Sequence, residues 1–97
     1  MRASLIINPA AGRGAGQTLG SAIVEYLAGL GIVAQPYYSR TADDVGLQVK
    51  QALATRADVI IVAGGDGTVH AAVNGWMQAD GGSPLAIVPI EIGRAHV

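Results

Sequence analysis

Three short segments with unbroken apolar runs constrain the fold of this chain more than any other feature. They are Ala3–Asn8, Val59–Ala63 and Ala86–Ile90. Runs of this length without polar alternation are typical of strands that are buried on both faces, as in a parallel sheet covered by helices. We therefore expect a parallel sheet with helices packed on it.

Two helices and a weaker strand are predicted between the first run and the second. The first helix has an apolar stripe formed by Leu19, Ile23, Leu27 and Leu30. Gly31 follows it as a C-cap. Residues 32–39 indicate a strand, and Pro36 favours an edge position for it because proline donates no backbone hydrogen bond.

The second and third helices each have a recognisable start. Thr41 is the predicted N-cap of the second helix, whose buried side carries Val45, Val49 and Leu53. The third helix is predicted to begin near Thr68, because residues with helical spacing follow it: Val69, Ala72, Val73, Trp76 and Met77. Strands and helices thus alternate from the first apolar run to the last.

This alternation predicts a three-layer α/β fold with a mostly parallel, Rossmann-like sheet and right-handed crossovers. The 97 residues, of which 51% are hydrophobic, provide for one small domain. Ligands of such folds bind beyond the carboxyl ends of the strands. The loops that follow the strands are therefore where we expect a functional site.

Composition limits the partners that the chain can take. Six Lys and Arg against seven Asp and Glu give a formal net charge of -1, so we expect no nucleic-acid partner and expect any phosphate to be held mainly by backbone groups. The chain has no cysteine, which excludes a disulfide framework and agrees with a cytoplasmic location. The apolar run before Asn8 is too short for a signal peptide or a membrane span.

The first polar loop, NPAAGRG at residues 8–14, follows the first predicted strand and precedes a helix. Its small residues allow the backbone to approach a phosphate, and the helix N-terminus directs N–H groups toward it. The loop matches neither the P-loop nor the dinucleotide-binding fingerprint. An ordinary strand-to-helix turn, which uses the same residue types, is the alternative interpretation.

The second loop, Gly64–Thr68, follows the most hydrophobic strand and opens the third predicted helix. Its glycines permit positive φ and close contact with a polyphosphate, and Thr68 is expected to cap the helix and bind a phosphate oxygen. A carboxylate beside phosphates is repulsive unless it orients a metal ion, a water or a hydroxyl, so Asp66 indicates phosphoryl transfer. An Asx bond within a glycine-rich turn is its alternative role.

The NPAAGRG start, the segment VAGGDGTVHAAVNG and the spacing between them closely resemble the catalytic domain of diacylglycerol kinase-like lipid kinases, which include sphingosine and ceramide kinases. The resemblance covers Met1–Ile90 and implies a nucleotide-binding domain of the NAD kinase and diacylglycerol kinase type. The ATP-binding residues that it implies are Asn8, Pro9, Ala10, Ala11 and Gly12 in the first loop, and Gly64, Gly65, Asp66, Gly67, Thr68, Val69 and His70 in the second. A hydroxyl at the end of the second strand completes this site, with Ser39 as the first choice and Thr41 as the alternative.

The resemblance implies transfer of the γ-phosphoryl group of ATP to a lipid hydroxyl, with Mg²⁺ neutralising the developing charge and Asp66 near the chemistry. It implies that the lipid site, the other Mg²⁺-associated acids and a proton acceptor come from a β-rich C-terminal domain that this chain lacks. We therefore expect the fragment alone to be inactive and the full-length protein to contact a membrane peripherally. The alternatives are a kinase like NAD kinase or phosphofructokinase, because GGDGT occurs in that wider group, and a noncatalytic nucleotide-binding module.

Two positions depart from the family pattern. Ala71 stands where the family usually has Glu, in T-x-x-E-x-V-N-G, and after Ile90 the chain reads EIGRAHV where the family continues Gly-Thr-Gly-Asn-Asp. The codons GAG ATC GGA AGA GCA CAC GTC encode EIGRAHV, and from their second base they match a common sequencing-adapter sequence. We therefore interpret residues 91–97 as a non-native tail after an ATP-binding part at residues 1–90, against the alternative of a divergent or naturally truncated tail. Glu91, Arg94 and His96 accordingly receive no functional role.

Overall fold

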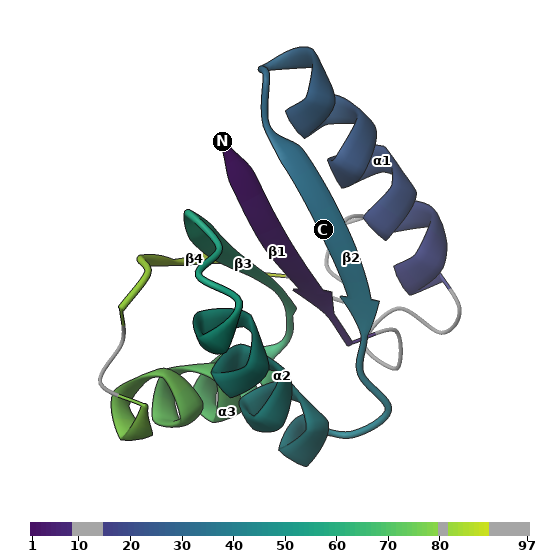
Figure 1. Cartoon of the computed structure of the whole chain (residues 1–97). Coiled ribbons are helices and arrows are strands. Elements are labelled where there is room, and N and C mark those ends of the chain that lie inside the picture. Colours follow the sequence, from purple (N-terminus) through teal and green to yellow (C-terminus); the bar gives the residue numbers. More distant parts are fainter. Residues whose placement is uncertain (9–14, 80–81, 90–97) are drawn as a thin grey trace.

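The computed structural model describes residues 1–8, 15–79 and 82–89, which form a four-stranded sheet with three helices (Figure 1). The elements in chain order are β1 (Arg2–Ile7), α1 (Ala15–Gly29), β2 (Val33–Tyr38), α2 (Ala42–Ala54), β3 (Val59–Gly64), α3 (Asp66–Gln78) and β4 (Leu85–Pro89). This is the predicted alternation, and the α/β fold class is confirmed.

The described strands are all parallel and lie in the order β2-β1-β3-β4. The central strands are β1 and β3, and their fully buried side chains include Leu5, Ile6, Ile7, Ile60 and Val62. β2 lies at an edge, where Pro36 is paired with β1 on one side only. The edge position predicted from this proline is therefore confirmed.

Helices cover the two faces of the sheet, with α1 on one face and α2 and α3 on the other (Figure 1). The side chains of Ile23 and Leu27 in α1 pack against a cluster that contains Leu5 and Ile7. Ile6, which alternates with them along β1, belongs instead to the cluster under the other two helices. Successive strand residues point to opposite faces, so one unbroken apolar run supplies both cores.

The capping of α2 is confirmed, and a pair of glycines sets the position of α3. Thr41 Oγ1 accepts the backbone N–H of Asp44 at 3.3 Å, and the Asp44 carboxylate accepts the N–H of Thr41 at 3.3 Å, which completes a capping box. α2 and α3 approach closely at Gly46 and Gly75, because a Cβ added at Gly75 would lie 2.7 Å from the carbonyl oxygen of Gly46. This contact holds α3 closely against α2.

Two predicted core positions are wrong. Leu30 is 60% exposed because α1 ends at Gly29, and Gly31 adopts a φ of 83° in the turn that follows. Met77 is 64% exposed because it lies past the buried side of α3, whereas its neighbour Trp76 packs against the core and donates its indole N–H to Ser83 O at 2.7 Å. Within the described ranges, none of the helices has the length and apolar character needed to cross a bilayer.

Candidate functional site

The carboxyl ends of the three neighbouring strands β2, β1 and β3 place Ser39, Asn8 and Gly64 in one row. The N–H of Ser39 donates to Ile7 O at 2.8 Å, and the N–H of Asn8 donates to Ala63 O at 3.2 Å, so the parallel register continues one residue beyond β1. Residues from chain segments far apart in sequence thus meet at one edge of the sheet. This is the edge at which α/β folds bind their ligands.

A side-chain hydrogen bond joins the two loops that the sequence singles out. Asn8 Nδ2 donates to Thr68 Oγ1 at 3.1 Å across 60 positions of sequence. Asn8 is half-buried, and Thr68 is only 3% exposed. The bond therefore fixes the end of β1, where the first loop begins, against the first turn of α3.

Thr68 is not the cap of α3, which corrects the prediction from sequence. The N-cap is Gly65, and Thr68 is the third residue of the helix, with its hydroxyl directed to Asn8. Thr68 packs so tightly beneath Gly64 that a Cβ added there would lie 2.5 Å from the Cβ of Thr68. The absence of a side chain at Gly64 thus makes room for Thr68. The positive φ predicted for the glycines of this loop is wrong for Gly64 and Gly65.

The N-terminus of α3 has the features of a phosphate-binding helix end. Its cap residue, Gly65, has φ −86° and ψ −168° and supplies no side-chain cap bond, and the first helical hydrogen bond runs from Val69 N to Gly65 O at 3.0 Å. The N–H groups of residues 66–68 come before that bond and point out of the N-terminal end of the helix. This end carries a partial positive charge. Gly67 is exposed, and a Cβ added there would meet no heavy atom within 4 Å.

Asp66 and His70 lie exposed on the first two turns of α3. Their spacing of four residues places them on neighbouring positions of the helix surface. Among residues 1–8, 15–79 and 82–89 there is no group of three or more His, Asp or Glu side chains that could hold a metal ion.

Ser39 and Thr41, the two candidate hydroxyls, differ in their surroundings. Thr41 Oγ1 serves as the acceptor of the α2 capping box. Ser39 lies in the row beside Asn8, is 1% exposed and donates its hydroxyl proton to Gln48 Oε1, 2.5 Å away. Ser39 thus lies in the row at the strand ends, whereas the Thr41 hydroxyl is used in the cap of α2.

Sequence reasoning missed Gln48, although the pattern of α2 contains a signal for it. Gln48 lies between Val45 and Val49 on the side of the helix that faces the sheet, where the other side chains are apolar. A polar residue on such a stripe needs a hydrogen-bonding partner. Here the partners are Ser39 and the carbonyl oxygen of Tyr38.

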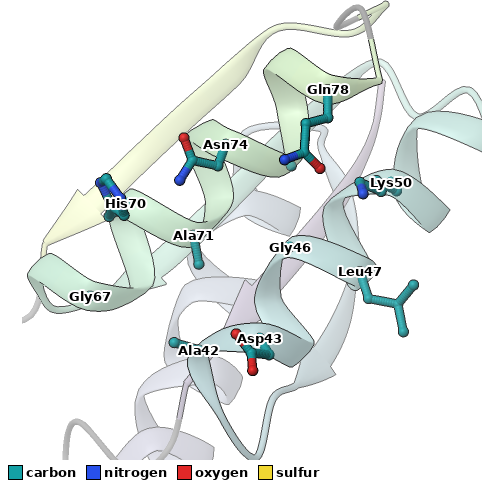
Figure 2. A pocket seen from close by; sticks show the side chains of 11 residues that line it. Ala42, Asp43, Gly46, Leu47, Lys50, Gly67, His70, Ala71, Asn74 and Gln78 are labelled. Atoms are coloured by element: carbon teal, nitrogen blue, oxygen red, sulfur yellow. The ribbon is translucent and has the colours of Figure 1, made fainter.

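A groove of about 420 Å³ runs between α2 and α3 next to this helix end (Figure 2). Gly46 and Gly75 line it where the helices meet, and Figure 2 shows His70, Asn74 and Gln78 along α3. The remaining lining residues are Ala42, Asp43, Leu47, Lys50, Gly67 and Ala71. Position 71, where the resembling family has Glu, is thus part of a groove that also includes Gly67 and His70 from the start of α3.

Some sequence predictions concern residues outside the described ranges. They are Pro9, Ala10, Ala11 and Gly12 of the first loop, and the tail at residues 91–97. Their proposed roles stay predictions.

Comparison with known proteins decides the family. Residues 2–93 match the family model described as the diacylglycerol kinase catalytic domain. The chain belongs to this family. Asn8 and Gly64–Thr68, which begin the first loop and form the second, both lie within the matched residues.

Several diacylglycerol kinases are similar to this chain. The protein from Staphylococcus carnosus is 29% identical over 98 residues, and that from Bacillus subtilis is 30% identical over 89 residues. These alignments cover 97% and 92% of this chain but 32% and 29% of the relatives. The chain thus spans about a third of the length of the curated diacylglycerol kinases that it matches.

A crystal structure of a diacylglycerol kinase from Bacillus anthracis has the same arrangement, with a TM-score of 0.75 and 34% sequence identity. The superposition covers 91% of this chain and 32% of that one. At this identity the structural similarity supports a common family as well as a common fold.

Proposed function

We propose that this chain supplies the nucleotide-phosphate-binding part of an ATP-dependent lipid kinase. The observation that carries the proposal is the Asn8–Thr68 hydrogen bond, which joins two family motifs at the uncapped N-terminus of α3. Membership of the diacylglycerol kinase catalytic domain family supports a phosphotransferase that acts on a lipid alcohol. We infer that ATP is the donor.

Backbone groups are the main phosphate ligands in this proposal. The N–H groups at the start of α3 face outward, and Gly67 leaves the space beside them open. A helix N-terminus attracts a phosphate through these donors and through its dipole. The net charge of -1 leaves the chain without a general basic field, so local donors have to provide the attraction.

Asp66 fits a role beside a nucleotide-bound Mg²⁺. Proteins commonly hold Mg²⁺ with one or two carboxylates together with substrate phosphates. Asp66 is an exposed carboxylate in the first turn of α3, beside the proposed phosphate site. When bound there, Mg²⁺ would neutralise charge that develops on the transferred group.

The reaction forms a bond between the γ-phosphorus of ATP and the lipid oxygen, and breaks the bond to the oxygen that bridges the β- and γ-phosphates. The lipid hydroxyl loses its proton to an acceptor, and ADP leaves. This chain spans about a third of the length of its relatives. We assign the lipid site and this proton acceptor to the remaining part of the protein. We further propose a cytoplasmic location and peripheral contact with the membrane that holds the lipid.

Substitution of Gly65 tests the phosphate site. The extended backbone of Gly65 is compatible with valine, so Gly65→Val adds bulk at the helix end without backbone strain. We expect loss of Mg·ATP binding by isothermal titration calorimetry, with helical content by circular dichroism nearly unchanged. Gly82→Val is the matched control, because Gly82 is exposed in open space before β4.

Unaltered ATP affinity in Gly65→Val would contradict the assignment. The intact protein should phosphorylate a lipid alcohol with ATP and Mg²⁺, whereas the 97-residue chain should not. Phosphorylation of NAD by the intact protein, with no lipid accepted, would overturn the proposed substrate class.

A further inference from the structure

The side chain of Gln48 connects α2 to the end of β2 through two hydrogen bonds. Its Oε1 lies 2.5 Å from the Ser39 hydroxyl oxygen, and its Nε2 lies 3.5 Å from the carbonyl oxygen of Tyr38. A backbone carbonyl only accepts hydrogen bonds, so the amide nitrogen has to face Tyr38 and the amide oxygen has to face Ser39. The amide oxygen in turn only accepts, so the proton between the two side chains belongs to Ser39.

This arrangement fixes the direction in which the Ser39 hydroxyl donates its hydrogen bond. A serine hydroxyl has one proton to donate and two lone pairs that accept. With its proton directed to Gln48, the Ser39 oxygen is left with accepting capacity. Ser39 is 1% exposed, and its burial strengthens the bond by keeping bulk water away from it.

Gln48 is itself held in place by the packing of α2. The capping box of Thr41 fixes the start of the helix, and the fully buried side chains of Val45 and Val49 lie on either side of Gln48 in sequence. Gln48 is therefore presented to the site from a rigid element. Ser39 lies next to Asn8 in the row at the carboxyl ends of the strands.

We propose that Gln48 is a positioning residue of the nucleotide site, which accepts the hydrogen bond of the Ser39 hydroxyl and thereby directs the lone pairs of the Ser39 oxygen toward the ligand as acceptors. The proposal rests on the proposed function, since it takes Ser39 as part of the ATP site. In that site Ser39 accepts a hydrogen bond from an N–H or O–H of the nucleotide or from a bound water. It does not donate to a phosphate oxygen.

A double-mutant cycle in the intact protein tests the proposal, with Ser39→Ala, Gln48→Met, the double variant and the control Gln51→Met. Gln51 is an exposed glutamine of the same helix. Mg·ATP affinity is measured by titration calorimetry, and unfolding by urea is measured on each variant. We expect Ser39→Ala and Gln48→Met each to weaken ATP binding by about fivefold, with the double variant no weaker than Ser39→Ala alone and the control unchanged.

Three results would overturn the proposal alone and leave the proposed function standing, and a fourth would overturn both. If Gln48→Met lowers stability but leaves ATP affinity unchanged, Gln48 is only a structural link. If the double variant loses ATP affinity by the product of the two single losses, the two residues act independently. In both cases the ATP site stands. An absence of coupling between the two substitutions in the unfolding free energy would show that their hydrogen bond does not form. If the intact protein does not bind Mg·ATP, both this inference and the proposed function fail.

Discussion

Replacing Gly64 by alanine should destabilise the chain, although alanine is normally the better residue for backbone order. The added Cβ would lie 2.5 Å from both Cβ and Cγ2 of Thr68 and 2.7 Å from its Oγ1. Either β3 or the first turn of α3 has to shift, and such overpacking costs about 1–3 kcal/mol. A shift of Thr68 would also stretch its 3.1 Å hydrogen bond with Asn8, which contributes about 1 kcal/mol more.

Gly67→Ala provides the matched control, because the same substitution three residues later meets no heavy atom within 4 Å. Gly67 lies in α3 with no positive φ, so alanine there should stabilise the chain by about 0.4–1 kcal/mol. Thermal unfolding by circular dichroism at 222 nm measures both effects. The midpoint should fall by at least about 4 °C in Gly64→Ala and rise by a few degrees in Gly67→Ala. Equal midpoints for the two variants would refute the close packing of Thr68 beneath Gly64.

Three further outcomes are expected. Gly75→Ala should lower the unfolding free energy by about 1–3 kcal/mol in urea titrations, because the alanine Cβ would lie 2.7 Å from the Gly46 carbonyl oxygen. An unchanged unfolding midpoint would show that α2 and α3 are not in close contact there. In the intact protein, Asp66→Asn should reduce turnover about 100-fold while ATP affinity changes little, whereas equal losses of both would assign Asp66 to loop structure. Amplification of the gene from source DNA should yield Gly-Thr-[Gly/Ala]-Asn after Ile90, and recovery of Glu-Ile-Gly-Arg-Ala-His-Val would end the interpretation of a non-native tail.

The fold could be predicted from sequence because its signals are local and agree with one another. Unbroken apolar runs mark three of the described strands, β1, β3 and β4, Pro36 marks the edge strand β2, and Thr41 with Asp44 marks the start of α2. The errors occur at helix ends. Helical spacing extends to Leu30 and Met77, but whether a side chain at the end of a stripe is buried depends on what packs against it, which periodicity does not contain.

The candidate site was predictable as two loops, but the contact between them was not. Topology places Asn8 and Gly64 at the same edge of the sheet, and sequence supplies that topology through the alternation of strands and helices. The role of Thr68 depends on a hydrogen bond across 60 positions, and the role of Gly64 depends on the volume that Thr68 occupies. Both are tertiary effects that override the local preference of threonine for a cap.

The central claim is that both loops bind one phosphate ligand. NMR tests it most directly, by following the backbone and side-chain amide signals of the ¹⁵N-labelled chain during a titration with Mg·ATP. The backbone N–H signals of Gly65, Asp66, Gly67 and Thr68 and the side-chain amide signal of Asn8 should move together, with a single dissociation constant. Signals that move elsewhere while these five stay fixed, or an Asn8 response with a separate dissociation constant, would contradict a single site formed by both loops.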